Sequence, residues 1–236
     1  MSDPLRIGFV VEGPTDRVLL EAIVSRLLDG REYVPEQLSP ELSETFAPLS
    51  GGGWTSVYRW CRQAASQAGD ALHGNPLLRR FDMLIVHADA DVAGRSYRDD
   101  QRIADAPRDL PCERPCPPAS DTTHELREVM QGWMGALSSQ SNLVLCTPSK
   151  SIETWILVAL YPENPIARDP HVECRPNPDA QLQNAPLAGR MIRGGKKDRR
   201  MYRQRAREVA AAWDVVTQRC PEAARFSVEV RITLAG

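Results

Sequence analysis

The sequence predicts an α/β fold in which a mostly parallel sheet is covered by helices on both faces. Short apolar runs that suit buried strands alternate with longer segments of helical period, which is the pattern of such a sheet. The 236 residues fit a single domain. We expect its core at about residues 5–160, a loop and helix insertion at 98–141, and a basic carboxyl-terminal extension at 185–236.

The first predicted strand runs from Leu5 to Val11, and a helix follows from about Arg17 to Leu28. The strand is an almost uninterrupted apolar run, as is typical of a buried parallel strand. In the helix, apolar residues recur at spacings of three and four. Glu12 lies between the two elements, so a carboxylate stands at the carboxyl end of a buried strand.

The next segments continue the alternation. Residues 33–38 form a weaker strand candidate, and residues 54–67 have the composition of a helix. The triple glycine at 51–53 lacks the Gly-Lys-Ser/Thr ending of a nucleotide-binding loop, so it predicts a tight turn or hinge rather than a phosphate cradle. A further strand is predicted at 82–88, and it ends just before Asp89.

The second half of the chain is less regular. Residues 104–121 predict an exposed loop, and Asp121 or Thr122 is expected to cap a helix that reaches about Leu137. Residues 142–146 predict a strand that leads into another helix.

Two elements are predicted near the carboxyl end of the sequence. Residues 199–219 predict one long helix. Apolar and polar residues alternate from Phe226 to Leu234, which predicts a half-buried strand.

Composition bounds the setting of the protein. The net charge of −2 excludes a uniformly basic coat, and no apolar run approaches the length of a membrane span. We expect a cytoplasmic location, because the first residues do not resemble a signal peptide. The six dispersed cysteines then predict free thiols. Cys112 and Cys116 could form half of a zinc site, but no second pair of ligand spacing accompanies them.

Three carboxylates follow two of the predicted strands: Glu12 follows the first, and Asp89 and Asp91 follow a later one. In a parallel sheet, ligands bind beyond the carboxyl ends of the strands. If strand geometry persists, Asp89 and Asp91 point to the same side and repel each other unless a cation lies between them. Oxygen ligands favour Mg²⁺ or Mn²⁺ over zinc. The sequence therefore predicts a divalent-metal site that engages a phosphate.

The pairing of Glu12-Gly13 with Asp89-x-Asp91-x-x-Gly94 resembles the signature of the Toprim family. This Rossmann-like domain occurs in topoisomerases, primases, recombination mediators and several nucleases. The resemblance implies that Glu12 is a general acid or base or a further ligand, and that Asp89 and Asp91 bind Mg²⁺ at a phosphodiester. It covers residues 5–146, and the chain has no room for the additional domains of topoisomerases and primases.

Within that family, the chain is similar to small stand-alone bacterial Toprim proteins and to the Toprim part of overcoming-lysogenization-defect nucleases. The segment Pro148-Ser149-Lys150-x-x-Glu153-x-Trp155 resembles their later acidic motif, which implies that Glu153 supports a second metal ion. His87 and Ala88 depart from the small or hydroxyl residues that many relatives carry, which leaves the substrate open. The resemblance also implies a role in anti-phage defence, with an ATPase or other protein partner encoded nearby.

Each candidate has an ordinary structural alternative. Glu12 also suits the amino terminus of the following helix, where an acid is stabilised by the helix dipole. Asp89 and Asp91 also suit a turn. Glu153 also fits a capped helix start, and His87 either packs beneath the site or contacts it.

Lysine is rare in this chain. Of 29 basic residues only Lys150, Lys196 and Lys197 are lysines. Lys150 stands close to Glu153 and could place a compact charge on a phosphate or a leaving oxygen. The alternative is a solvated lysine at a helix start.

Basic residues concentrate between Arg190 and Arg207, where Asp198 is the sole acid. Such a cluster predicts contacts with nucleic-acid phosphates, with an aromatic side chain available for base stacking. The predicted binding residues are Arg193, Lys196, Lys197, Arg199, Arg200, Tyr202 and Arg203. The alternative is a solvated helix face.

These observations predict a phosphodiesterase that uses one or two Mg²⁺ or Mn²⁺ ions and cuts DNA or RNA, as a Toprim endonuclease does. The predicted catalytic residues are Glu12, Asp89, Asp91, Lys150 and Glu153, and the predicted metal ligands are the same carboxylates. The alternative is a Toprim-like module that binds nucleic acid or a partner without cutting.

Overall fold

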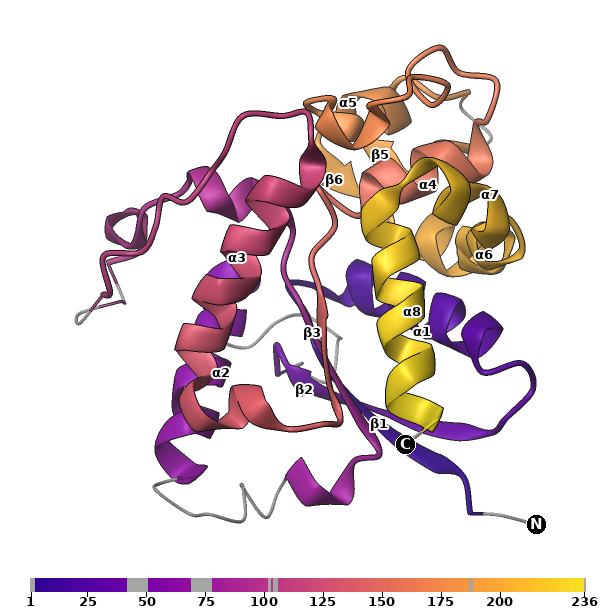
Figure 1. The fold of residues 1–236 in the computed structure, drawn as a ribbon. Coiled ribbons are helices and arrows are strands. Elements are labelled where there is room, and N and C mark those ends of the chain that lie inside the picture. Colours follow the sequence, from indigo (N-terminus) through magenta and orange to yellow (C-terminus); the bar gives the residue numbers. More distant parts are fainter. Residues whose placement is uncertain are drawn as a thin grey trace.

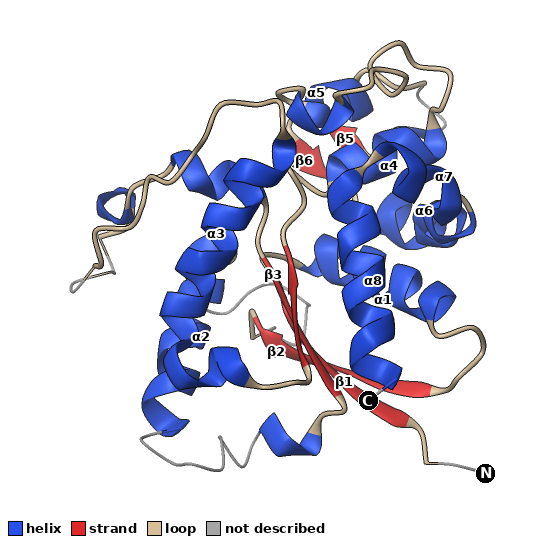
Figure 2. Cartoon of the chain, in the orientation of Figure 1, coloured by secondary structure: helices blue, strands red, loops and turns tan. Residues whose placement is uncertain are grey.

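A computed structural model describes residues 3–41, 51–68, 78–101, 103, 106–186 and 189–235. At its centre is a four-stranded sheet of order β2-β1-β3-β4, in which every neighbouring pair is parallel (Figure 2). The strands are β1 (Leu5–Val10), β2 (Tyr33–Ser39), β3 (Met83–His87) and β4 (Leu143–Cys146). The predicted α/β class is confirmed.

Helices cover both faces of this sheet: α2 and α3 lie on one side, and α1 and α8 on the other (Figure 1). The helices are α1 (Pro14–Leu27), α2 (Trp54–Ala68), α3 (Ala119–Met134), α4 (Glu153–Leu160), α5 (Pro178–Gln183), α6 (Arg199–Ala211), α7 (Trp213–Arg219) and α8 (Pro221–Ala235). A short antiparallel hairpin, β5 (Ile192–Arg193) and β6 (Lys196–Lys197), precedes α6. No helix within the described ranges is long and apolar enough to cross a membrane.

Two hydrophobic cores lie on opposite faces of the sheet. In β3, Met83 and Ile85 belong to the core under α1, α4 and α6–α8, while Leu84 and Val86 belong to the core under α2 and α3. This division follows from the alternation of side chains along a strand. Because both faces are buried at β3 and β4, these strands are apolar runs, and the sequence predicts them well. The edge strand β2 is polar and half-buried, which is why it was the weaker prediction.

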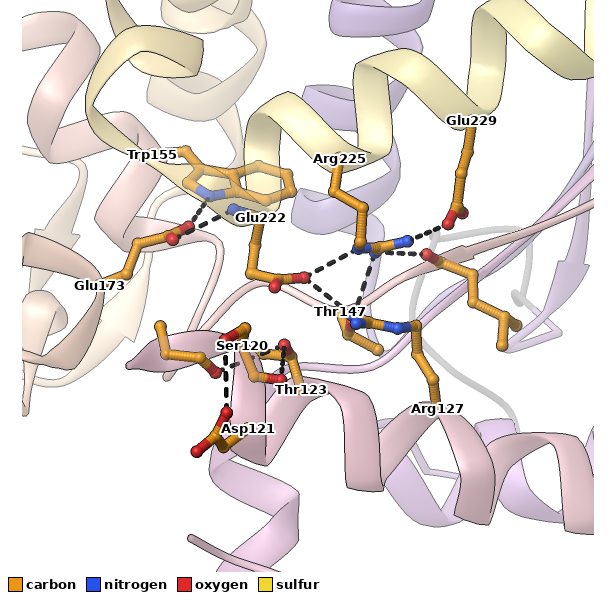
Figure 3. Close-up of polar contacts among 12 residues, drawn as sticks. Ser120, Asp121, Thr123, Arg127, Thr147, Trp155, Glu173, Glu222, Arg225 and Glu229 are labelled. Atoms are coloured by element: carbon orange, nitrogen blue, oxygen red, sulfur yellow. Dashed lines mark hydrogen bonds and ion pairs between the residues drawn. The ribbon is translucent and has the colours of Figure 1, made fainter. Parts of the chain in front are cut away.

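A buried ion-pair network ties α3 to α8 (Figure 3). Oε2 of Glu222 lies 2.8 Å from Nη1 of Arg127 and 2.9 Å from Nε of Arg225. Arg225 also donates to the carbonyl of Leu145 in β4, at 2.8 Å. The two helical layers are thus joined across the end of β4.

The predicted strand at Phe226–Leu234 is wrong, because this segment forms most of the helix α8. Phe226 and Val230 are buried four residues apart, as in a helix that packs on one face. Val228 and Ile232 create the apparent alternation, yet they are 52% and 66% exposed. Two exposed apolar residues on the outer face of the helix therefore imitated the pattern of a strand.

Two predicted helix boundaries also need correction. The single helix expected at 199–219 is divided at Ala212 into α6 and α7, which buries Trp213 against Trp155 with ring centroids 5.3 Å apart. Helix α3 begins at Ala119, so neither Asp121 nor Thr122 caps it. Residues 104 and 105 of the predicted loop lie outside the described residues.

The prediction that all cysteines are free thiols is wrong. Cys116 and Cys174 form a disulfide across a sequence separation of 58 residues. It links the loop before α3 to the segment after α4, and it removes Cys116 from any zinc site. Spacing along the chain could not reveal this pairing, because connectivity depends on which segments meet in space.

Candidate functional site

Polar side chains gather where β1, β3 and β4 end. Glu12 follows β1, Asp89 follows β3, and Glu153 opens α4 after β4. Parallel pairing brings the three carboxyl ends to one edge of the sheet. We use the term acidic site for the carboxylates that interact there: Glu12, Asp16, Asp89, Asp91, Glu153 and Asp179.

Glu12 contacts the loop that carries Asp89. Its Oε1 accepts a hydrogen bond from the backbone nitrogen of Asp89 at 2.8 Å. Its carbonyl accepts one from Gly53 at 2.8 Å, where a positive φ of 83° turns the chain before α2. Gly53 thus lies in a bend just before α2. The residue that precedes α1 is Gly13, and no side chain caps that helix by a hydrogen bond, so Glu12 does not cap it in that way.

The carboxylates of the acidic site repel one another in a poorly solvated setting. Removal from water and the charge of Asp89 raise the pKa of Glu12 to about 8. Burial also raises the pKa of Asp16. Burial and the charge of Glu153 raise the pKa of Asp179 to about 7. Since each added negative charge is unfavourable there, a cation would stabilise the cluster.

Asp89 is held from two sides. Its Oδ1 accepts a hydrogen bond from the backbone nitrogen of Ile152 at 2.9 Å and lies 3.2 Å from Nε2 of His87. Burial lowers the pKa of His87, but the neighbouring carboxylates outweigh it and raise that pKa to about 9. His87 therefore packs beneath the site and contacts Asp89, and the surrounding carboxylates favour its charged form.

Asp91 is the exposed member of the pair. The strand ends at His87, and Asp91 lies in a turn of 3₁₀ helix at Ala90–Gly94, so the assumption that strand geometry persists is wrong. Its backbone nitrogen donates to the carbonyl of Lys150 at 3.0 Å. The surrounding protein removes part of the water from the carboxyl of Asp91, and this desolvation and the charge of Asp89 raise the pKa of Asp91 to about 6.

Glu153 is completely buried and is paired with a lysine from the hairpin. Its Oε1 lies 2.6 Å from Nζ of Lys197 and accepts a hydrogen bond from the hydroxyl of Tyr202 at 2.8 Å. Lys197 also lies 3.4 Å from Oδ1 of Asp16. Burial alone would lower the pKa of Lys197. The negative charges of Asp16 and Glu153 have the opposite and larger effect, so the pKa is raised and the ammonium stays charged.

These contacts correct the predicted base stacking by Tyr202 and change the setting of Lys197. Tyr202 is fully buried, so it cannot stack on a base. Lys197 reaches into the acidic site instead of joining a surface patch. Both residues were placed on the surface because a run of basic residues usually forms a solvated face.

Two acids were missed in the sequence. Asp16 lies in the first turn of α1, directly after the loop that carries Glu12, and this nearness in the sequence could have signalled it. Asp179 lies in α5, within a region that has little apolar pattern, and we find no sequence signal for it.

Lys150 has a partner outside the acidic site. Its Nζ lies 2.8 Å from Oε1 of Glu113, in the loop before α3. Its backbone has a positive φ of 62°, and its carbonyl accepts the hydrogen bond from Asp91. The backbone of Lys150 thus contacts the acidic loop, while its side chain contacts Glu113.

The remaining basic residues are spread over the hairpin and α6. Arg193 lies 3.8 Å from Asp198, and Lys196 and Arg200 are exposed. Arg199 and Arg203 line a cavity beside α1.

Two observations bear on whether a metal ion fits the acidic site. Within the described part of the chain, no group of three or more His, Cys, Asp or Glu side chains is arranged to hold one. The donors nevertheless have the chemistry that Mg²⁺ prefers, because they are carboxylate oxygens. Oε2 of Glu153 is buried and has no hydrogen-bond partner among the described residues, which is the condition a hard cation would relieve.

Comparison with known proteins finds no matching family model, no matching curated protein and no matching solved structure.

Proposed function

We propose that the protein is a metal-dependent phosphodiesterase of the Toprim family that cuts nucleic acid. The observation that carries the proposal is the hydrogen bond between Glu12 and the backbone of Asp89, 2.8 Å long, at the ends of two adjacent parallel strands. Glu153 is drawn to the same place, because its neighbour Ile152 donates to Asp89.

Asp89, Asp91 and the unpartnered oxygen of Glu153 would hold one or two Mg²⁺ or Mn²⁺ ions, with Glu12 as a further ligand. When bound, such an ion polarises the scissile phosphate and lowers the pKa of an attacking water.

The protein's own residues supply orientation and charge. The contact with His87 fixes Asp89, and the amide of Asp89 fixes the Glu12 carboxyl. If Glu12 is not a ligand, it is placed to transfer a proton to or from an oxygen of the phosphodiester. Lys197 contacts Asp16 of α1 and carries a positive charge. In the proposed reaction this charge offsets the negative charge that develops on the phosphate.

A nucleic-acid substrate is supported by the basic residues around the acidic site. The hairpin before α6 carries Arg193 and Lys196, and the first turn of α6 carries Arg200. The same helix carries Tyr202, which donates a hydrogen bond to Glu153. Contacts of this kind bind phosphates without reading sequence. The proposal includes a cytoplasmic role in anti-phage defence, with an ATPase or other partner encoded nearby.

One observation favours a non-cleaving alternative. The ammonium of Lys197 already lies 2.6 Å from Glu153, so part of the negative charge is neutralised without a metal ion. A Toprim-like module that only binds nucleic acid would need no more than this.

Cleavage assays separate the two functions. Purified protein is incubated with single- and double-stranded DNA and RNA in Mg²⁺, in Mn²⁺ or in EDTA. We expect cleavage of at least one substrate with a metal and none in EDTA. Binding without cleavage under every condition would favour the alternative, and cleavage that persists in EDTA would contradict the metal site.

A further inference from the structure

A cavity of about 210 Å³ lies between α1 and α6. Its walls include the guanidinium-bearing residues Arg17, Arg199 and Arg203 and a single carboxylate, that of Glu21. Glu21 is matched by Arg17, since its Oε1 lies 2.5 Å from Nε of Arg17. Three of the four ionisable side chains that line the cavity are therefore arginines.

Arg17 is fixed before any ligand arrives. Besides its contact with Glu21, its Nη1 donates to Oε1 of Gln37 in β2 at 3.0 Å. A guanidinium that is already oriented loses less side-chain entropy when it binds an anion. This wall of the cavity is therefore pre-organised for a phosphate.

The cavity adjoins the acidic site. Thr15 lines it, and the next residue, Asp16, points its Oδ1 at Lys197 at 3.4 Å. The cavity and the acidic site thus share the first turn of α1.

The hollow continues along the same two helices. A second cavity of about 660 Å³ shares Arg203 and Glu21 with the first. Its other walls are Arg26 and Arg207 together with mostly apolar side chains, and Arg26 pairs with Asp214 at 3.4 Å. Arg199, Arg203 and Arg207 stand four residues apart on α6, so they form a row with a rise of about 6 Å per step. We name the two cavities together the α1/α6 groove.

We propose that the α1/α6 groove binds the phosphates of a single nucleic-acid strand next to the acidic site. The inference rests on the proposed function. It places the bound nucleic-acid strand along Arg199, Arg203 and Arg207 rather than along the β5–β6 hairpin. A groove that tracks a polyanion with guanidinium groups suits a single strand. It lies between two packed helices, which leaves less room for a duplex.

Binding is measured in EDTA, so that no cleavage is needed. Fluorescence anisotropy follows a labelled single-stranded DNA, the RNA of the same sequence, and the DNA duplex at several salt concentrations. Arg199→Gln, Arg203→Gln and Arg207→Gln are compared with Arg231→Gln, an exposed arginine on α8 outside the groove. Urea unfolding confirms that each variant is folded.

We expect each groove variant to bind a single strand at least fivefold more weakly than the wild type. The slope of log affinity against log salt should become shallower by about 0.7 per arginine removed. Arg231→Gln should stay within twofold of the wild type. A loss in the groove variants no larger than the loss in Arg231→Gln would overturn the groove, as would tighter binding of the duplex.

The result is independent of catalysis. If the groove variants lose binding but the wild type never cuts, the groove stands and the nuclease proposal fails. If the wild type cuts while the groove variants bind normally, the groove is overturned and the nuclease proposal survives.

Discussion

The ammonium nitrogen of Lys197 lies 2.6 Å from Oε1 of Glu153, which joins a surface hairpin to the buried start of α4. Glu153 has no exposed surface, so its charge depends on Lys197 and on the hydroxyl of Tyr202. A buried carboxylate without such partners is strongly unfavourable. The hairpin therefore helps to hold the acidic site together.

Replacing Lys197 by methionine should destabilise the fold. The change leaves Glu153 and Asp16 without their cation, and breaking such a buried pair costs about 3 kcal/mol. Urea unfolding measures the loss. Lys196→Met, which removes an exposed charge from the same hairpin, is the control and should change the unfolding free energy by less than about 0.5 kcal/mol. Equal effects of the two variants would refute the role given to Lys197.

Replacing Tyr202 by phenylalanine should have a smaller effect. The ring still fills its buried place, but the 2.8 Å hydrogen bond to Glu153 is lost. A hydrogen bond to a charged group contributes about 2 kcal/mol. We expect a loss of that size in urea unfolding. A variant as stable as the wild type would show that Lys197 alone satisfies Glu153.

The network between α3 and α8 offers a matched pair of variants. Glu222 is 3% exposed and pairs with Arg127 and Arg225, so Glu222→Gln should cost about 3 kcal/mol of unfolding free energy. Glu229 pairs with Arg225 too, but its side chain is 39% exposed. Glu229→Gln should therefore cost less than about 1 kcal/mol. Chemical denaturation measures the unfolding free energy of both variants. A larger loss of stability in Glu229→Gln than in Glu222→Gln would contradict this expectation.

Glu173 should make stability depend on pH. Burial raises the pKa of its carboxyl from 4.5 to about 7, against hydrogen bonds from Trp155 and from the backbone of Glu222. A raised carboxyl pKa favours folding below pH 4.5, and this contribution is lost as the pH rises through 7. Between pH 5 and 8 the wild type should lose about 2 kcal/mol more than Glu173→Gln. Parallel pH curves of the two proteins would exclude this assignment.

The strands and the acids at their ends could be predicted because both depend on local sequence. A strand buried on both faces must be apolar throughout, so β1 and β3 are visible, and Glu12 and Asp89 follow directly. In α8, Val228 and Ile232 are apolar although they face outward, and no local rule distinguishes them from strand residues.

Tertiary contacts explain the other failures. Lys197 turns inward because Gly194 and Gly195 adopt positive φ angles of 55° and 73° and reverse the chain between β5 and β6. Its partner Asp16 is 181 residues away in the sequence. The disulfide of Cys116 with Cys174 likewise depends on two loops that meet only in the folded chain.

The rate of metal-dependent cleavage in Asp91→Asn tests the central claim most directly. Asp91 is exposed, so the substitution should leave the fold intact while it removes a proposed metal ligand. Asp29→Asn, in an exposed turn where asparagine tolerates the positive φ of 48°, is the matched control. We predict that Asp91→Asn cuts at least 100-fold more slowly than the wild type in Mg²⁺, and that Asp29→Asn cuts normally. Equal rates in all three proteins would contradict a metal site at the acidic edge of the sheet.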